Sequence, residues 1–430
     1  MLQARGIRIA VATCALGLGL GLLGVLSAGH AADGVAPSGF VSTSGKRFVD
    51  GDGRPLPVKC VNLGHWLVPE GYILDFETAK SPSAIYDLTE RLLGDAASDR
   101  FWSRFRDRYI TEADIRLIKS LGFNTVRVPF HYEMFVTDGD APTISGTGFQ
   151  LLDRLVRWAE DAGLYLIFDM HAAPGGQTGI NHDDSVGFPL MFYVPAHQDL
   201  TVRIWRAIAE RYKDETIVLG YDLLNEPIAP YYDTWHLNPQ LEPFYRRLVA
   251  AIREVNKKHV IFLAGAQWST NFEVFGPPFD DNLAYTYHMF WAATTRDSIQ
   301  KFLNFSNRYD VPLLLGESGE ASIDWIRDFR ELHDAHGIGW CFWTYKNMGS
   351  DASVVVVPRP KEWETLLAAV NSPKSSPGSA KASEPARDVL MLALDGYLEN
   401  IELENTTINS AYVEALGLPS STPTAIGRDP

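Results

Sequence analysis

Cysteine is scarce in this sequence of 430 residues. Only three cysteines occur, and Cys14 lies inside an apolar run at the N-terminus. The other two, Cys60 and Cys341, are too few for a disulfide framework or a zinc cluster. Hydrophobic residues make up 46% of the chain. Stability is therefore expected to come from a large hydrophobic core.

Basic residues are also few relative to acidic ones, with 38 Lys and Arg against 53 Asp and Glu. The formal net charge is −15 and the isoelectric point is near 5.2. Binding to nucleic acid needs a basic surface that faces the phosphates, so no nucleic-acid partner is predicted. The eleven Trp and seventeen Tyr residues suit stacking against sugars. Aromatic residues also build ordinary cores, so they do not identify a ligand by themselves.

Long apolar runs are absent beyond the N-terminal segment. Residues 1–32 carry Arg5 and Arg8, then an apolar stretch over 9–26, then small residues over 27–32. This order predicts a signal peptide, cleaved after one of its last two alanines, and an exported protein that is secreted or periplasmic. The alternative is an uncleaved membrane anchor. After cleavage no membrane association is expected.

Eight short apolar runs, most of them followed by an amphipathic segment, organise the region that follows. Such runs between helices predict parallel strands that are covered on both faces. Eight of these units predict an α/β fold, a (β/α)8 TIM barrel that forms a single catalytic domain. The alternative is a doubly wound open sheet, but no glycine-rich turn follows the first run. The runs are 58–63, 123–128, 164–170, 218–224, 259–264, 283–288, 311–316 and 339–343.

The barrel domain is expected to span 33–370, with a short leading loop or hairpin and a helical insertion over 81–109. Residues 371–430 read as a C-terminal extension, with a Ser/Pro/Gly-rich linker, a helix over 387–400 and a disordered final twenty residues. In a closed barrel Cys60 and Cys341 would lie on neighbouring first and last strands. Two buried thiols are expected there, and a disulfide is the alternative.

Polar side chains gather where the predicted strands end. In barrels of this kind the active site lies at the C-terminal ends of the strands. Two glutamates stand out, because Glu226 is followed by the strand-ending Pro227 and Glu317 follows the run 311–316. Paired carboxylates at strand ends predict glycoside hydrolysis, and a separation of about 5–5.5 Å would give the retaining mechanism. The other candidates are Asn62, His65, Trp66, Glu70, Arg127, Asp169, His171, Asn225, His288 and Trp343.

A family resemblance rests on four stretches. Asn225-Glu226-Pro227 and Gly316-Glu317-Ser318-Gly319 resemble glycoside hydrolase family 5, the cellulase family. The stretch over 62–68, Asn-Leu-Gly-His-Trp-Leu-Val, and the stretch over 169–177 are similar to the exo-β-1,3-glucanase-like members. The resemblance implies a retaining β-glycosidase, with Glu226 as acid/base and Glu317 as nucleophile. It also implies substrate-binding or supporting roles for Glu70, Arg127, His171, Asn225, His288 and Trp343.

Two positions depart from the family pattern. His65 stands where the exo-glucanase-like members have glycine. Phe290 replaces the tyrosine of a His-x-Tyr sequence. In the family the hydroxyl of this tyrosine contacts the nucleophile, and phenylalanine has no such hydroxyl. Tyr287 or Tyr345 is the candidate for compensating this loss.

Three further features of the sequence bear on chemistry. His182, Asp183 and Asp184 offer metal ligands, but a substrate-loop or surface role is favoured. His333 and His336 are expected to be solvated near a helix end. Glu320, close to Glu317, either supports the site or takes no part in it.

The sequence therefore predicts a retaining β-glycosidase, without cofactor or metal, that acts on β-glucosides or β-glucans. Its partner would be an oligosaccharide, a polysaccharide or a small β-glycoside. The insertion 81–109 and the loop 175–195 would wall the cleft into a pocket, which favours exo action. The alternatives are an endo-acting glucanase or mannanase, and a non-catalytic carbohydrate-binding barrel, to which Phe290 points.

Overall fold

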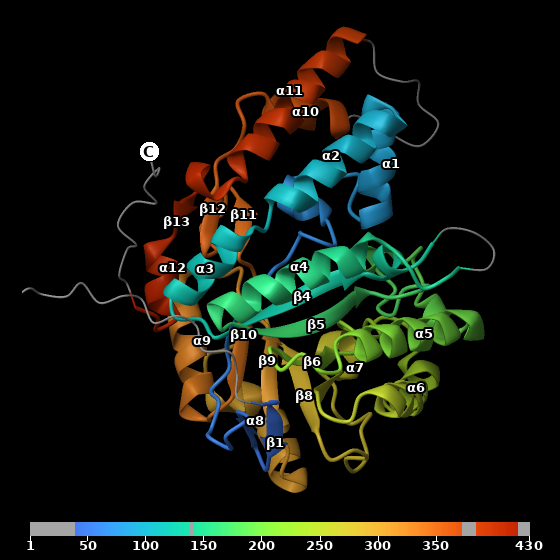
Figure 1. Ribbon diagram of the computed structural model, residues 1–430, viewed down its shortest axis with the longest axis vertical. Helices are drawn as coiled ribbons and strands as arrows, with labels where there is room; N and C mark the ends of the chain where they lie inside the picture. The colour runs from blue at the N-terminus through green and yellow to red at the C-terminus, as the bar shows by residue number, and fades with distance from the viewer. Residues whose placement is uncertain (1–38, 138–141, 372–383, 420–430) are drawn as a thin grey trace, which may run out of the picture. The chain divides into compact units, whose positions relative to one another are not determined.

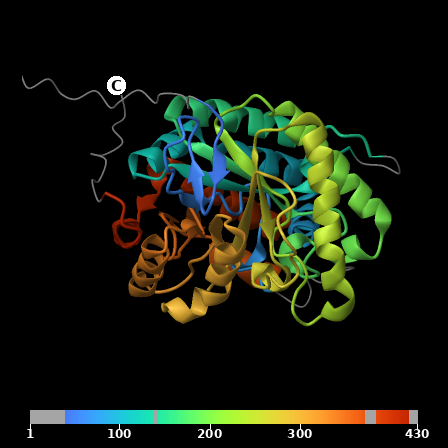
Figure 2. The ribbon, with the colours of Figure 1, turned by 90° about the horizontal axis from the view of Figure 1, so that it is seen from below.

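The computed structural model describes residues 39–137, 142–371 and 384–419. The predicted signal peptide and most of the linker lie outside these ranges. Within them, eight parallel strands close into a barrel in the order β10-β3-β4-β5-β6-β7-β8-β9, and the helices surround it (Figures 1 and 2). This confirms the (β/α)8 barrel. The strands are β3 Lys59–Asn62, β4 Thr125–His131, β5 Tyr165–Ala172, β6 Val218–Asp222, β7 Val260–Ala264, β8 Leu283–His288, β9 Leu313–Glu317 and β10 Gly339–Phe342.

Local sequence signals mark the ends of several helices. At Thr111 a capping box with Asp114 satisfies free N–H groups at the start of α3, and Gly163 closes α4 in a left-handed conformation. The helices of the barrel are α3 Glu112–Ser120, α4 Thr147–Ala162, α5 Pro195–Arg211, α6 Thr234–Val255, α7 Ala266–Ser269, α8 Arg296–Tyr309, α9 Ile323–Ala335 and α10 Trp363–Val370. Short 3-10 turns are η1 Gly71–Leu74, η2 Tyr132–Phe135, η3 Asn181–Asp183, η4 Leu190–Phe192 and η6 Leu403–Asn405.

The core has two layers, one between the barrel and its helices and one inside the barrel. The interior layer includes Ile167, Leu219 and Leu314. A leading hairpin, β1 Ser42–Ser44 with β2 Arg47–Val49, adds Phe48 to this layer, where its ring lies 5.7 Å from that of Phe262. Most strand residues are buried because helices cover one face and the barrel interior covers the other.

The two cysteines form a disulfide, so the expectation of two free thiols is wrong. Cys60 on β3 pairs directly with Cys341 on β10, and their Cα atoms are 4.2 Å apart. Both side chains belong to the interior layer of the barrel. Sequence could place the two residues on neighbouring strands, but it could not give the register that puts them opposite each other.

The predicted insertion forms two helices, α1 Pro82–Leu93 and α2 Asp95–Arg108, which pack against α11 Glu384–Asn400 (Figure 1). The expectation of a disordered final twenty residues is wrong as far as residue 419. Strands β11 Lys346–Met348, β12 Val355–Val357 and β13 Thr407–Ile408 form a small sheet, and α12 Ser410–Ala415 packs on α9. The reason is apolar burial, since Tyr412 and Val413 are at most 2% exposed.

His333 also differs from the expectation, because it is buried. Its Nδ1 atom lies 2.7 Å from the carbonyl oxygen of Phe329, and its ring packs beside Tyr287. Burial lowers its pKa to about 4. His336 at the end of α9 is half-buried.

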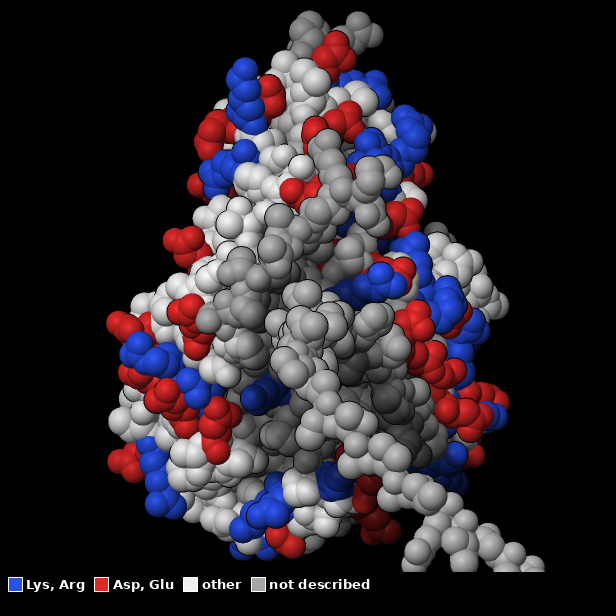
Figure 3. All heavy atoms as spheres, turned by 60° about the vertical axis from the view of Figure 1, so that its left-hand side comes forward, with Lys and Arg blue, Asp and Glu red and all other residues white. Residues whose placement is uncertain are grey.

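Acidic and basic side chains are interspersed over the described part of the face in Figure 3. On α9, ion pairs such as Arg330–Asp334 and Arg327–Asp324 bring opposite charges together. Among the helices of the described ranges, none has the length and apolar character needed to cross a bilayer.

Candidate active site

A cavity of about 520 Å³ opens at the C-terminal ends of the barrel strands. Seven of the eight predicted site residues line it, and the eighth, Arg127, lies buried beneath it. The seven are Glu70, His171, Asn225, Glu226, His288, Glu317 and Trp343. The structure therefore brings together side chains that are up to 273 positions apart in sequence, from Glu70 to Trp343.

The two glutamates reach the cavity from opposite sides of the barrel. Glu317 is the last residue of β9, and Glu226 follows β6 with a left-handed backbone (φ 46°) just before Pro227. An oxygen of each carboxylate and a nitrogen of His288 all lie within 4.8 Å of one another. The Nδ1 atom of His288 lies 3.0 Å from Glu226 Oε1 and 3.5 Å from Glu317 Oε2.

His288 is held as a neutral ring. Burial lowers its pKa to about 3, although the charge of Glu317 acts in the opposite direction. A neutral imidazole has one N–H, and the neighbouring carboxylates favour that proton on Nδ1. Gly316 leaves room for the ring, because a Cβ atom there would lie 2.9 Å from Nε2 of His288. The sequence therefore needs glycine beside Glu317.

Arg127 is the centre of a buried polar network under the cavity. Its guanidinium lies 2.6 Å from Glu317 Oε1, 2.9 Å from Asp222 Oδ2 and 3.0 Å from Asp169 Oδ1. It also donates to Oδ1 of Asn225 at 2.9 Å and to Oδ1 of Asn62 at 3.0 Å. The planar fork of arginine can reach this many partners, and a lysine could not.

Charge in this network is shared unequally. Burial alone would lower the pKa of Arg127, but the carboxylates of Asp169, Asp222 and Glu317 raise it above its usual value. Burial raises the pKa of Asp169 and of Asp222 to about 7, against the opposing effect of Arg127. One guanidinium thus contacts three carboxyl groups, and the pKa values of two of them, Asp169 and Asp222, are raised.

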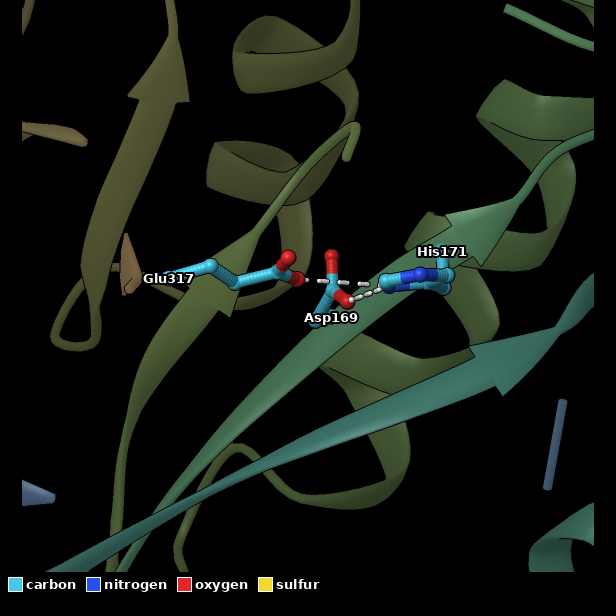
Figure 4. Close-up of side chains that lie close together, drawn as sticks. All are labelled: Asp169, His171 and Glu317. Atoms are coloured by element: carbon cyan, nitrogen blue, oxygen red, sulfur yellow. Dashed lines mark hydrogen bonds and ion pairs between the residues drawn. The ribbon is translucent and has the colours of Figure 1, made fainter. Parts of the chain in front are cut away.

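Asp169, His171 and Glu317 lie in a row, as Figure 4 shows. His171 Nδ1 lies 2.8 Å from Asp169 Oδ2 and 3.8 Å from Glu317 Oε1. Burial lowers the pKa of His171 to about 3, so the ring is neutral. These three residues have the spacing of a metal site. The guanidinium of Arg127 already contacts both carboxylates, however, so their negative charge has a cationic partner.

Two further glutamates, Glu70 and Glu320, line the cavity. Glu70 is 7% exposed, and its Oε1 has no hydrogen-bond partner among the described residues. Burial and then the charges of Glu317 and Glu320 raise its pKa well above the usual value. Glu320 lines the cavity and bonds to Tyr72, whose hydroxyl accepts the Nε1–H of Trp343 at 2.6 Å. Glu320 is therefore part of the cavity wall.

His65, the residue in place of a family glycine, keeps the backbone conformation that glycine favours (φ 70°). It is fully buried, and its Nδ1 accepts the backbone N–H of Glu70 at 3.0 Å. The imidazole thus fixes the segment that carries Glu70. Trp66, also a candidate, lies in the core, and its Nε1–H donates to the carbonyl of Arg106.

His182 is a cavity residue that the sequence did not single out as such. Its Nε2 lies 3.4 Å from Glu226 Oε2, on the other side of that carboxylate from His288. It belongs to η3, in the loop that the substrate-loop interpretation favoured. The signal that could have found it is the length of the loop after β5, since its residues can reach back over the strand ends.

Asp183 and Asp184, beside His182, have structural partners. Asp183 accepts backbone N–H groups of Thr178 and Ser185 at 2.5 and 3.0 Å. Asp184 accepts from the backbone and the hydroxyl of Ser83 on α1, and its other oxygen lies 3.2 Å from His131 Nε2. These bonds fix the loop and tie it to the insertion.

Phe290 lines the cavity, and neither tyrosine compensates for its missing hydroxyl. The Tyr287 ring stacks on Phe302, and its hydroxyl has no partner in the described part of the chain. The Tyr345 hydroxyl donates to Asp114 at 2.9 Å. The polar neighbours of Glu317 are therefore Arg127, His171 and His288.

Comparisons with known proteins agree with this geometry. The family model "Cellulase (glycosyl hydrolase family 5)" matches residues 92–349, more than half of the chain. A protein named Beta-xylosidase from Phanerodontia chrysosporium is 28% identical over 76% of this chain and 75% of its own length. A probable glucan 1,3-beta-glucosidase A from Neosartorya fischeri is 32% identical, but the match covers only 50% of this chain and 51% of that protein.

The fold also resembles a solved structure, the rutinosidase from Aspergillus niger. The match has a TM-score of 0.57 at 16% identity, and covers 80% of this chain and 98% of the other. At this identity the likeness concerns the fold alone. Together with the family model, which spans β4 to β10 and both strand-end glutamates, these findings show that the chain belongs to glycosyl hydrolase family 5 and hydrolyses β-glycosidic bonds.

Proposed function

We propose that the protein is an exo-acting, retaining β-glycosidase in which Glu317 is the nucleophile and Glu226 is the acid/base. The observation that carries this proposal is the convergence of the two carboxylates. Their oxygens lie within 4.8 Å of each other, with His288 between them. This spacing is too short to admit a water molecule between the sugar and a general base, so it supports double displacement.

In the first step Glu226 gives a proton to the glycosidic oxygen while Glu317 attacks the anomeric carbon. The bond from that carbon to the leaving oxygen breaks, and a covalent glycosyl-enzyme forms. The guanidinium 2.6 Å from Glu317 gives this carboxylate a cationic partner and orients it. Asn225, held by Arg127 at 2.9 Å, can bind the hydroxyl next to the anomeric carbon as charge develops there.

In the second step Glu226, now a carboxylate, takes a proton from water, and the water attacks the anomeric carbon. Glu317 leaves, and the product keeps the β configuration. His288 and His182 flank Glu226 at 3.0 and 3.4 Å, so both can orient this carboxylate through the two steps. The sequence of events needs no group beyond the residues of the chain.

Exo action is supported by the wall of the cavity. Asp184 in the loop after β5 binds Ser83 on α1, so the insertion and the loop meet. Elsewhere in the lining, the Tyr72 hydroxyl accepts the Nε1–H of Trp343. A cavity of about 520 Å³ that is bounded by anchored loops holds the end of a chain or a small glycoside more readily than the middle of a polymer. The names of the relatives suggest a terminal β-glucosyl or β-xylosyl residue.

Export is part of the same proposal. The basic, apolar and small-residue order of residues 1–32 supports a cleaved signal peptide. The Cys60–Cys341 disulfide supports an oxidising compartment. Expression with secretion and N-terminal sequencing of the product tests this point, and an intact Met1 on the secreted protein would refute cleavage.

The decisive experiment measures hydrolysis of aryl β-glucoside, xyloside, mannoside, galactoside and cellobioside. Glu317→Gln should lose essentially all turnover. Glu226→Ala should lose far more turnover on glycosides with poor leaving groups than on activated glycosides. Only a poor leaving group needs to be protonated by the acid as it departs. Glu331→Gln, an exposed glutamate on α9, is the matched control. Proton NMR of the first-formed sugar should show the β anomer. Sugar binding without turnover on any substrate would instead favour the carbohydrate-binding barrel.

A further inference from the structure

The cavity has two chemically different halves. Its floor carries the hydrogen-bonding groups around Glu226 and Glu317, and Glu70, Tyr72 and Glu320 form a polar side wall; these groups suit the hydroxyls of one sugar ring. The rest of the lining comes from the loops after β5, β7 and β8 and is almost wholly apolar. These mouth residues are Ile180, Trp268, Thr270, Met289, Phe290 and Trp291.

The few polar groups at the mouth are already engaged. The Thr270 hydroxyl donates to the carbonyl of Gln267 at 2.7 Å, and the Trp291 Nε1–H donates to the carbonyl of Glu320 at 2.8 Å. Only Nε1 of Trp268 lacks a partner in the described ranges. A second sugar ring would bring several hydroxyls that lose water on entry, and each would need a new partner. The mouth offers little to replace that water.

The aromatic rings at the mouth are nevertheless held in place. Trp291 is 70% exposed, which is unusual for so large a side chain, and its ring lies 5.8 Å from Phe290. Trp268 lies on a backbone in which residues 267–269 all have φ between 51° and 61°, a strained arrangement for side-chain-bearing residues. Gln267 fixes this turn through side-chain bonds to Asn238 and Asn271.

The leaving group must lie along these rings. The glycosidic oxygen has to reach Glu226, and the sugar occupies the floor. Ile180 and His182 belong to one loop, and His182 is 3.4 Å from Glu226, so the mouth begins beside the acid.

We propose that the mouth of the cavity binds an apolar, aromatic aglycone, so that the physiological substrate is a β-glycoside of an aromatic alcohol and not a disaccharide or glucan. This inference rests on the proposed function for the position of the leaving group. Flat rings can stack on Trp268 and Trp291 and bury apolar area without forfeiting hydrogen bonds to water.

The test compares three simple leaving alcohols of similar basicity on one glycone, so that leaving-group chemistry favours none of these three. Methyl, benzyl and 2-naphthylmethyl β-glycosides are measured beside laminaribiose and cellobiose. We expect kcat/KM for the 2-naphthylmethyl glycoside to exceed that for the methyl glycoside by about tenfold or more, as burial of a large ring predicts. Equal or faster turnover of either disaccharide would overturn the proposal.

Two variants test whether Trp291 and Trp268 bind the aglycone. In Trp291→Ala and in Trp268→Ala the ratio of kcat/KM for the 2-naphthylmethyl and methyl glycosides should fall about tenfold in at least one variant. Trp235→Ala is the matched control, since Trp235 is 90% exposed at the start of α6 and does not line the cavity. An unchanged ratio in both cavity variants would refute the assignment.

Binding separates this inference from the proposed function. Calorimetry with Glu317→Gln measures the affinity for the 2-naphthylmethyl glycoside and for laminaribiose without turnover. Tighter binding of the aromatic glycoside by about tenfold is expected. Equal or weaker binding would overturn the aglycone assignment even if the enzyme proves to be a retaining glycosidase. Absence of turnover by the unmodified enzyme would overturn the proposed function alone.

Discussion

Nη1 of Arg127 lies 2.6 Å from Oε1 of Glu317, and both side chains are buried. The guanidinium belongs to β4 and the carboxylate to β9, on different sides of the barrel. Two distant strands therefore meet in one charge-assisted bond at the floor of the cavity. The proposed nucleophile is oriented by the barrel itself and not by a loop.

Replacing Arg127 with lysine should damage both catalysis and stability. Lysine keeps the charge but loses the fork that reaches Asn225, Asp222 and Glu317 together. We expect kcat to fall by about 10²–10³, similar to the loss of one preorganised transition-state contact. The free energy of unfolding should fall by about 3 kcal/mol, because buried carboxylates lose partners. Steady-state kinetics and urea unfolding measure the two effects.

Arg253→Lys is the matched control for this substitution. Arg253 makes a two-bond pair with Asp280 at 2.8 Å, away from the cavity. Its kcat should stay within twofold of the original. An unchanged kcat in Arg127→Lys would show that the guanidinium does not act on Glu317.

His333 should make the protein less stable in acid. Its pKa is about 4 in the folded chain because the ring is buried, against an ordinary value of 6.5. Between these values the unfolded state binds the extra proton, so stability is complete above pH 6.5 and is lost as pH falls toward 4. At pH 5 the loss from this residue amounts to about 2 kcal/mol.

Urea unfolding of His333→Gln at pH 7 and pH 5 measures this loss. The decrease in the free energy of unfolding between the two pH values should be smaller than in the original protein by about 2 kcal/mol. His236→Gln, at an exposed position on α6, should leave the decrease unchanged. An equal decrease in both variants would mean that His333 does not titrate on unfolding.

Removing the disulfide should lower stability and leave activity largely intact. Cys60 and Cys341 are separated by 281 positions, and the chain-entropy model gives at most about 5–6 kcal/mol for so long a loop. The Cys60→Ala/Cys341→Ala protein should therefore melt at a lower temperature. Calorimetry with and without reductant checks this, since reductant should affect only the original protein. Equal melting temperatures would refute a stabilising bond.

Loosening the wall should weaken substrate binding more than chemistry. In Asp184→Ala the loop that carries His182 loses its bonds to Ser83. We expect KM to rise about threefold to tenfold, corresponding to one or two lost charged hydrogen bonds, with a smaller change in kcat. Asp199→Ala, which breaks an exposed ion pair with Arg247 on the outer helices, is the control. A larger effect on kcat than on KM would place Asp184 in the chemical step.

Much of the fold was predictable because buried parallel strands leave continuous apolar runs. Seven of the expected runs differ from the observed strands by one to three residues at an end, as at 123–128 against Thr125–His131, and 283–288 agrees fully. The C-terminal tail was not predictable, because α12 depends on a groove beside α9 that only the folded barrel provides. The disulfide was missed for a similar reason, since it depends on register between strands far apart in sequence.

The site was predictable where a residue ends a strand. Arg127, His171, His288 and Glu317 belong to or terminate strands, and all reach the site. Loop residues were harder to predict, because whether a loop side chain enters the site depends on backbone turns such as the one that carries Trp268. His182 was found only through its distance to Glu226.

The disulfide has a topological consequence. It joins the first strand of the barrel to the last, so residues 60–341 form a covalent ring that contains every barrel strand. A single protease cut anywhere within that ring would leave the two halves of the barrel linked. The protein would thus stay one covalent molecule after a cut in the loops that follow its barrel strands.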